Sequence, residues 1–293
     1  MAATVRTAPA CDERLTAFIR RHPRLLVLTG AGCSVASGIP EYRDHDGAWK
    51  SRPPVRYAEF VGSAAARRRY WARSLFGWAR VAQAAPSAVH RALARLEHGG
   101  FARAIVTQNV DALHQRAGSR RVIDLHGRLD EVECLQCGTR LRRTDVQEVL
   151  TAWNGAFLAA FGDALRAAPS ARPDGDAQVE TDFSEFRVPD CPACGGVLKP
   201  AVVFFGENVP RERVEAALAA LAAADALLVV GSSLMVFSGL RFCLAARDMG
   251  KPVAAVNLGR TRADELLSLK VAADCGPALE EAAAALGLGA RPL

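Results

Sequence analysis

Short apolar runs, each followed by a glycine or a polar turn, recur along the chain and constrain its fold more than any other feature. The runs cover residues 25–28, 104–107, 226–230 and 253–256. Their length and composition are typical of buried strands in a parallel sheet. Helices are predicted before and between them, at residues 12–21, 87–97 and 211–223. This alternation predicts an α/β fold with a doubly wound, Rossmann-like parallel sheet, whose turns face one crevice at the carboxyl ends of the strands.

Two regions break the alternation and predict a small module inserted into the sheet domain. Residues 43–85 are interpreted as a loop followed by helices, and residues 130–200 contain two cysteine pairs. The sheet domain is then expected to comprise residues 13–42, 86–129 and 201–293. Residues 1–12 are expected to form a disordered tail.

The overall composition excludes several classes of protein. Half of the 293 residues are hydrophobic, which is enough for a large core, yet no apolar run reaches the ~18–20 residues that span a bilayer. The first residues lack a secretory signal, so a cytoplasmic location is expected. The net charge of +6 suits an anionic partner such as a dinucleotide. The basic run Arg67–Arg69 has no aromatic residues interleaved, so we predict a solvated helix face rather than a nucleic-acid site. We expect no membrane partner and a monomer.

Four of the eight cysteines form two CxxC pairs, separated by 53 residues. They are Cys134, Cys137, Cys191 and Cys194. Four thiolates complete a tetrahedral Zn²⁺ site and leave no open position, so the metal is expected to be structural. A disulfide and a redox CxxC are the weaker alternatives for a chain of this size without a secretory signal.

The turn after the first predicted strand carries Gly30-Ala31-Gly32. A Gly-x-Gly turn lets backbone N–H groups approach a pyrophosphate. The third glycine of a GxGxxG motif is missing, because Val35 occupies its place. The motif alone is therefore equally consistent with an ordinary tight turn.

Three further segments carry polar or aromatic side chains that could take part in catalysis or binding. Residues 107–114 read TQNVDALH, in which Asn109 or Asp111 could simply cap a helix. His126 lies between a short apolar stretch and Gly127, near the proposed crevice, and an imidazole suits general-base chemistry. His114 is expected to pack beside the QNVD turn. The run LKPAVVFFGE, at residues 198–207, predicts a buried strand.

These strings, in this order, resemble the sirtuin family from about Leu25 to Cys275. The similarity covers GAGxSxxSGIPxYR, TQNxDxLH, HG and the valine-aromatic strand, with Tyr42 where the family commonly has Phe. The resemblance implies an NAD-dependent protein-lysine deacylase that releases nicotinamide and O-acyl-ADP-ribose, with acyl-lysine proteins or peptides as substrates. It further implies that His126 is the general base, and that Asn109 and Asp111 line the pocket for nicotinamide and its ribose.

The resemblance also implies a set of residues that contact NAD. This set comprises Gly30, Ala31, Gly32, Ser34, Ile39, Pro40, Tyr42, Arg43, Gln108, Asn109, Asp111, Gly231, Ser232, Ser233, Asn257, Leu258, Gly259 and Cys275. The residues implied to wall the lysine tunnel and pair with the peptide are Val203, Phe204, Phe205, Gly206 and Glu207. The segment expected on the other side of the peptide, residues 235–239, lacks a proline that the family often carries, which weakens that part of the resemblance.

The long gap between the cysteine pairs resembles the mitochondrial class II sirtuins, which carry an insert there. Tyr70 and Arg73 have the YxxR spacing of sirtuins that accept acidic acyl groups, and would share one helix face. Arg73 could grip a carboxylate with support from Tyr70, or Tyr70 could be core and Arg73 solvated. Short, acidic, lipoyl and long-chain acyl groups all stay open.

Two other functions use the same residues. Mono-ADP-ribosyl transfer to protein would use the same NAD site, and only product analysis separates it from deacylation. A zinc-stabilised NAD sensor without turnover would leave His126 unexplained. A hydride-transferring dehydrogenase is disfavoured by the incomplete GxGxxG motif.

Overall fold

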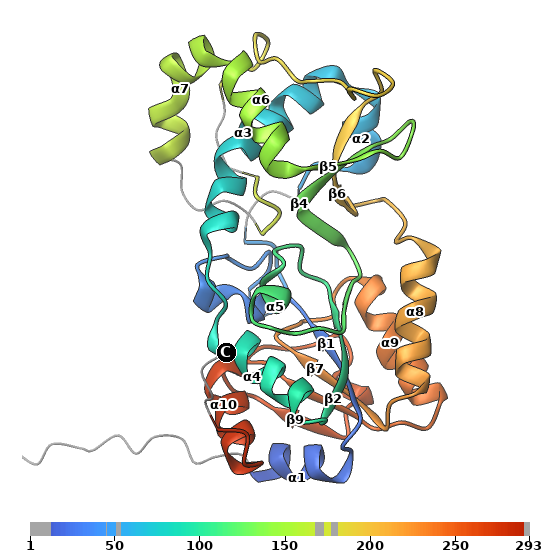
Figure 1. Cartoon of the computed structure of the whole chain (residues 1–293). Helices are drawn as coiled ribbons and strands as arrows, with labels where there is room; N and C mark the ends of the chain where they lie inside the picture. The colour runs from blue at the N-terminus through green and yellow to red at the C-terminus, as the bar shows by residue number, and fades with distance from the viewer. Residues whose placement is uncertain (1–12, 45, 51–53, 168–172, 177–180, 290–293) are drawn as a thin grey trace, which may run out of the picture.

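The computed structural model describes residues 13–44, 46–50, 54–167, 173–176 and 181–289. The predicted tail, residues 1–12, lies outside this part of the chain. The molecule has a large sheet with its helices in one half and a smaller sheet with its helices in the other (Figure 1).

The large sheet has six parallel strands in the order β3-β2-β1-β7-β8-β9. They are β1 (Leu25–Thr29), β2 (Ala102–Thr107), β3 (Val122–Asp124), β7 (Ala226–Val230), β8 (Val253–Val256) and β9 (Leu269–Val271). The first strand lies in the centre and the order reverses between β1 and β7, which is the doubly wound arrangement that the sequence predicts. The three-residue strands β3 and β9 are too short to give a pattern of their own.

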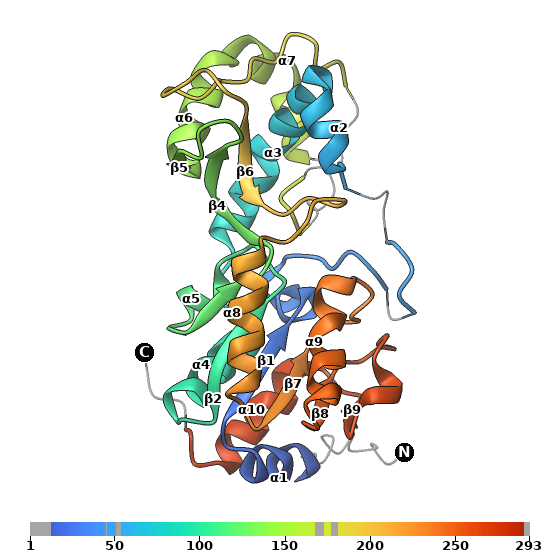
Figure 2. The same ribbon diagram turned by 90° about the vertical axis from the view of Figure 1, so that its right-hand side faces the viewer.

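Helices cover both faces of the large sheet. One face packs against α1 (Glu13–Arg21), α4 (Ala88–His98) and α10 (Cys275–Ala285), and the other against α8 (Arg211–Ala222) and α9 (Phe237–Asp248) (Figures 1 and 2). Along β1, Leu25 and Val27 join the first core while Leu26 and Leu28 join the second. Both faces of the strand are therefore dry, which is why its sequence is a continuous apolar run.

The small module is built around the antiparallel sheet β5-β4-β6. Its strands are β4 (Gly127–Cys134), β5 (Arg140–Arg142) and β6 (Leu198–Val202). Its helices are α2 (Tyr57–Gly62), α3 (Ala64–Gln83), α6 (Arg143–Trp153) and α7 (Gly155–Ala167). Trp71, Phe60 and Phe186 are buried in a core of its own. The expected domain limits at residues 130 and 200 fall inside β4 and β6, because the two strands pair as far as Gly127 and Val202.

The strand predicted over residues 198–207 occupies only the first half of that run. β6 ends at Val202. Beyond it, Val203 N still donates to His126 O, and Phe205 forms an isolated parallel bridge with Arg56. β6 pairs only with β4, so it is an edge strand, and Pro200 is tolerated there without a lost ladder bond.

The remaining elements are short. They are α5 (Leu113–Arg116) and the 3₁₀ turns η1 (Ala31–Cys33), η2 (Val35–Ser37) and η3 (Asp264–Leu266). Within the described part of the chain, the helices are too short or too polar to cross a bilayer.

Candidate active site

A large pocket opens at the carboxyl ends of the central strands and continues under the small module. It has a volume of ≈ 690 Å³ and is lined by the turns after β1, β2, β7 and β8 and by the segment after β6. The residues predicted for NAD that line it are Gly30, Ala31, Gly32, Ser34, Ile39, Tyr42, Arg43, Gln108, Asn109, Asp111, Gly231, Ser232, Ser233, Asn257, Leu258, Gly259 and Cys275. His126 and the substrate candidates Tyr70, Val203, Phe204, Phe205, Gly206 and Glu207 also line it. Pro40 and Arg73 do not.

The exclusion of Pro40 follows from the local turn. The N–H of Ile39 closes back onto Ser34 O at 3.2 Å, so the turn ends at Ile39, which lines the pocket. Pro40 itself is not a lining residue, although Glu41 and Tyr42, which follow it, line the pocket.

The glycines after β1 are required by contact with the turn after β7. A Cβ on Gly30 would lie 2.7 Å from Ser232 Cβ, and a Cβ on Gly32 would lie 2.9 Å from Gly231 Cα. The N–H groups of Gly30 and Gly32 donate to Val230 O and Gly231 O at 3.1 and 2.9 Å. These two N–H groups therefore join the two turns, so backbone donors to a pyrophosphate would have to come from other residues of the turn.

Ser34, Asn109 and Asp111 form one hydrogen-bonded group. Ser34 Oγ donates to Asp111 Oδ2 at 2.6 Å, and Asn109 Nδ2 donates to Ser34 Oγ and Gly30 O at 3.1 and 3.0 Å. Burial raises the pKa of Asp111, and the hydrogen bond from Ser34 opposes that effect. Asp111 Oδ1 also accepts from Leu113 N, at the start of α5, at 3.0 Å, but the N-cap residue of this helix is Ala112 rather than Asn109 or Asp111.

Gln108 connects three strand ends. Its Nε2 donates to Thr29 O at 3.1 Å and to Ser232 Oγ at 2.8 Å. The amide packs so closely on Gly239 of α9 that a Cβ there would collide with it. The floor of the pocket is therefore held by contacts between segments that are distant in sequence.

His126 is bonded at both ring nitrogens. Nδ1 lies 2.8 Å from Gln108 O, and Nε2 lies 2.8 Å from Ser238 Oγ. A carbonyl oxygen can only accept, so Nδ1 carries the proton and Nε2 has the lone pair. Burial lowers the pKa of His126 to about 4, while the bond to Gln108 opposes the shift. The ring is therefore a neutral base at physiological pH.

The small module fixes the backbone of His126. Its carbonyl accepts from Val203 N at 2.8 Å. Gly127 has φ 80°, and a Cβ there would collide with Ala201 O. Only glycine fits this crossing of β4 over β6, which explains the HG pair.

The other buried histidines lie behind the pocket. His114 Nε2 is 2.9 Å from Thr29 Oγ1, and the His114 ring lies 4.7 Å from that of His90. The contacts of the His114 side chain are therefore with Thr29 and His90. Of the histidines that the structure describes, His126 alone lines the pocket.

Aromatic side chains form the wall on the module side. Tyr42, Trp49 and Phe205 meet edge to face with ring centroids 5.5–6.2 Å apart, and the Arg43 guanidinium lies 4.0 Å from the Trp49 ring.

Glu207 has a different role from the rest of its segment. Its carboxylate accepts from Phe204 N at 2.8 Å and from Lys199 Nζ at 3.1 Å, which closes the turn after β6.

Tyr70 and Arg73 separate into different surroundings. Tyr70 is buried against Phe60 and Phe204 and lines the pocket, and burial raises the pKa of its phenol. Arg73 Nε pairs with Asp176 Oδ1 at 2.9 Å, and both side chains are buried. Neither interpretation of Arg73 holds. Arg73 does not line the pocket. It is also not solvated, because its guanidinium is buried against the Asp176 carboxylate of the insert.

Several lining residues have no signal in the sequence strong enough to select them. They are Trp49, Asp174, Ser238, Arg241 and the start of α4 at Ser87–Val89. Ser238 lies in the segment that departs from the family pattern, and that departure was the only available clue.

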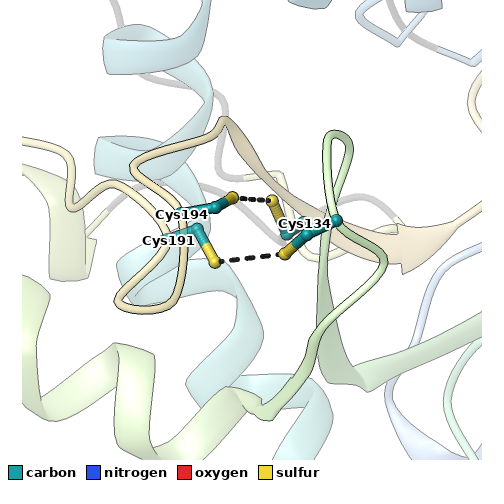
Figure 3. A group of neighbouring side chains, drawn as sticks. Cys134, Cys191 and Cys194 are labelled. Atoms are coloured by element: carbon teal, nitrogen blue, oxygen red, sulfur yellow. Dashed lines mark hydrogen bonds between the residues drawn. The ribbon is translucent and has the colours of Figure 1, made fainter.

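The four paired cysteines converge in the small module, away from the pocket. Cys134 is the last residue of β4 and Cys137 follows it, while Cys191 and Cys194 precede β6; Figure 3 shows the two segments facing each other. Sγ atoms of Cys134 and Cys194 are 3.5 Å apart, those of Cys137 and Cys191 are 3.8 Å apart, and all four lie within 4.8 Å. Zn–S bonds of about 2.3 Å in a tetrahedron place sulfurs about 3.8 Å apart, so the cluster fits a structural zinc ion.

Known proteins share this arrangement. The family model described as the Sir2 family matches residues 30–238. The chain is 57% identical over 273 residues to NAD-dependent protein deacetylase 2 of Bradyrhizobium diazoefficiens, with 93% of this chain and 97% of the relative aligned. It is 46% identical over 269 residues to NAD-dependent protein deacylase Sirt4 of Drosophila melanogaster, with 90% of this chain and 84% of the relative aligned.

Solved structures agree with these relatives. A Sir2 protein bound to an acetylated peptide has a TM-score of 0.72 at 28% identity, over 94% of this chain and 99% of that chain. A Sir2 protein with a p53 peptide and NAD⁺ has a TM-score of 0.72 at 29% identity, over 95% of this chain and 99% of that chain. The chain therefore belongs to the Sir2 family.

Proposed function

We propose that this protein is an NAD-dependent protein-lysine deacylase with His126 as its general base. The observation that carries the proposal is the state of His126: a neutral imidazole, with its basic Nε2 lining a pocket of dinucleotide size. The relatives named as deacetylases and deacylases support the same activity.

The residues present fit an extended NAD molecule. The volume of the pocket lies within the range of ligand sites, and its polar groups are concentrated at the strand ends. By family position, Ser232, Ser233 and Asn257 would hold the adenosine half, while Asn109 and Asp111 would hold the nicotinamide ribose. NAD, when bound, supplies an electrophilic ribose carbon with nicotinamide as the leaving group.

The residues around His126 determine what it can do. Nε2 accepts a proton from a hydroxyl presented in the pocket, and Gln108 O stabilises the resulting cation through Nδ1–H. Ser34 and Asn109 hold the Asp111 carboxylate in place. The surrounding apolar wall keeps water away from the reacting groups.

The acyl-lysine peptide is proposed to lie between the segment after β6 and the start of α9. Val236 and Phe237 there are 39% and 55% exposed, which is unusual for large apolar side chains and leaves them available to a partner. An extended peptide would bind mainly through its backbone. The solved Sir2 structure with an acetylated peptide supports this choice of substrate.

Neutral acyl groups are expected to be the better substrates. A dicarboxylic acyl group would need Arg73, which is paired with Asp176, and would meet the Asp174 carboxylate that lines the pocket. We expect acetyl or longer neutral acyl peptides to be hydrolysed at least tenfold faster than succinyl or glutaryl peptides. Faster turnover of the acidic acyl peptides would show that the ion pair opens.

The test is nicotinamide release from NAD, with mass spectrometry of the products, against a panel of acetyl, lipoyl, long-chain, succinyl and glutaryl peptides. Release coupled to deacylation, with about a 10²–10⁴-fold loss in His126→Ala and none in the exposed control His98→Ala, is the expected result. ADP-ribose on protein without deacylation would favour the transferase. NAD binding without nicotinamide release would favour a sensor.

A cytoplasmic location and a monomeric state stay proposals from the sequence. Size-exclusion chromatography with light scattering would test the second.

A further inference from the structure

Ser238 stands against the catalytic nitrogen of His126. It lies in the first turn of α9, it is 8% exposed, and its Oγ is 2.8 Å from Nε2. Ser238 and His126 are 112 residues apart in the sequence and both line the pocket. The contact therefore places a hydroxyl beside the proton-accepting atom of the site.

We propose that Ser238 is a positioning residue for His126, which holds the imidazole with Nε2 unprotonated and facing the pocket. The inference rests on the proposed function and adds a residue to it. The imidazole ring lies between Gln108 O and Ser238 Oγ and is hydrogen-bonded to both. Rotation of the ring or exchange of its tautomer would therefore break these hydrogen bonds.

The hydroxyl suits this task because it can both donate and accept. Toward neutral His126 it donates to the lone pair of Nε2, which favours the tautomer protonated at Nδ1. The pocket hydroxyl that gives up its proton must first replace Ser238 at this lone pair. Ser238 keeps its own proton, which moves aside by rotation about the Cβ–Oγ bond, and the transferred proton ends on Nε2.

The surroundings of Ser238 make the position rigid. The following residue, Gly239, packs directly on the side-chain amide of Gln108. The main-chain carbonyl of Gln108 accepts the hydrogen bond from His126 Nδ1. The start of α9 and the turn after β2 thus hold the two sides of one ring. Arg213 of α8 and Arg241 of α9 are the charged groups that act on His126, and both lower its pKa.

The experiment compares Ser238→Thr with Ser238→Val, which have nearly the same shape and differ by the hydroxyl. Ser238→Ala is added, and Ser268→Ala is the control, since the Ser268 hydroxyl donates to Val253 O instead. Histidine ¹⁵N NMR of the free enzyme at neutral pH reports the tautomer of His126, with the resonance assigned by His126→Ala. Steady-state kinetics over pH then give kcat, the KM for NAD and the acid limb of kcat/KM.

We expect wild type and Ser238→Thr to show one tautomer, protonated at Nδ1. Ser238→Val and Ser238→Ala should show a mixture, with kcat lowered roughly tenfold and the KM for NAD nearly unchanged. The lost hydrogen bond to the neutral ring should move the acid limb up by about half to one pH unit. Ser268→Ala should match wild type.

The proposal is overturned if Ser238→Val and Ser238→Thr give the same spectrum and the same kcat. A change in melting temperature alone, with tautomer and kinetics intact, would also overturn it, because it would show a structural role only. If the wild type does not deacylate any peptide, the proposed function fails, while the spectra of the free enzyme still decide whether Ser238 sets the tautomer.

Discussion

At the residue scale, the pocket depends on groups that are buried in a defined protonation state. His126 is held neutral by burial, and Asp111 is shifted upward in pKa by the same cause. Burial disfavours the charged form of each group, so the imidazole becomes a base while the carboxylate becomes easier to protonate. Hydrogen bonds from Ser34 and to Gln108 limit both shifts.

The ion pair between Arg73 and Asp176 is the residue-scale feature with the largest expected effect on stability. Both side chains are less than a tenth exposed. Because Arg73 would lose the buried carboxylate that it pairs with, Asp176→Ala should lower the free energy of unfolding by about 3–5 kcal/mol.

Urea unfolding of Asp176→Ala, Arg73→Met and the double variant would measure this effect as a cycle. The free energy of unfolding should fall less in the double variant than the sum of the decreases in the two single variants. Additive losses would mean that the pair is not coupled in solution. Asp182→Ala, at an exposed carboxylate, is the matched control.

At the element scale, the turns after β1 and β7 act as one unit. Gly32→Ala would force a Cβ to within 2.9 Å of Gly231 Cα, and backbone on both sides cannot move aside easily. We expect at least tenfold weaker NAD binding and a loss of about 1–3 kcal/mol in stability.

Gly62→Ala is the matched control, since an added Cβ there has no neighbour within 4 Å. Calorimetric titration with NAD and thermal melting would compare the two variants. Equal NAD affinities for both would show that the two turns separate more readily than their contacts indicate.

The zinc cluster stabilises the small module at the ends of β4 and β6. Cys191→Ser should remove a ligand and release the metal, with a loss of several kcal/mol in stability, because binding free energy is folding free energy at such sites. Metal content by atomic absorption and thermal melting would measure both changes.

Cys243→Ala is the control for this prediction. Cys243 is buried outside the cluster, and burial raises the pKa of its thiol to about 12. The control should keep one zinc per chain. Full zinc retention in Cys191→Ser would contradict the four-cysteine assignment.

At the scale of the whole molecule, buried neutral histidines make stability depend on pH. Burial lowers the pKa of His90 to about 4 and lowers that of His114 well below its usual value. Between pH 6.5 and 4 the unfolded chain binds protons at these sites and the folded chain does not. Stability is therefore complete above pH 6.5 and falls as the pH falls through this window.

For His90 alone the expected loss at pH 4 is on the order of 3 kcal/mol relative to pH 7. Urea unfolding of wild type and His90→Gln at pH 4.5, 5.5 and 7 would test it. The difference in free energy of unfolding between wild type and His90→Gln should shrink or reverse at acid pH. A constant difference across the range would contradict a neutral buried His90, and exposed His98→Gln is the control.

The sequence by itself determined the four central strands of the large sheet, three of the helices that cover it and the zinc ligands, because these depend on local patterns. A buried parallel strand needs a continuous apolar run, and a closed zinc site needs four thiolates at CxxC spacing. The motif strings also selected His126 and about half of the residues that line the pocket, because most of the predicted residues follow the end of a strand. Pro40 and Arg73 are the exceptions among the predicted site residues.

Only the tertiary structure decided how the lining residues are used. Arg73 pairs with a carboxylate more than a hundred residues away, and the N–H groups of Gly30 and Gly32 are used by the turn after β7. The partner of His126 Nε2 is a serine on α9, brought there by the close packing of Gly239 on Gln108. Such contacts join segments distant in the chain, and local pattern carries no information on which donor meets which acceptor.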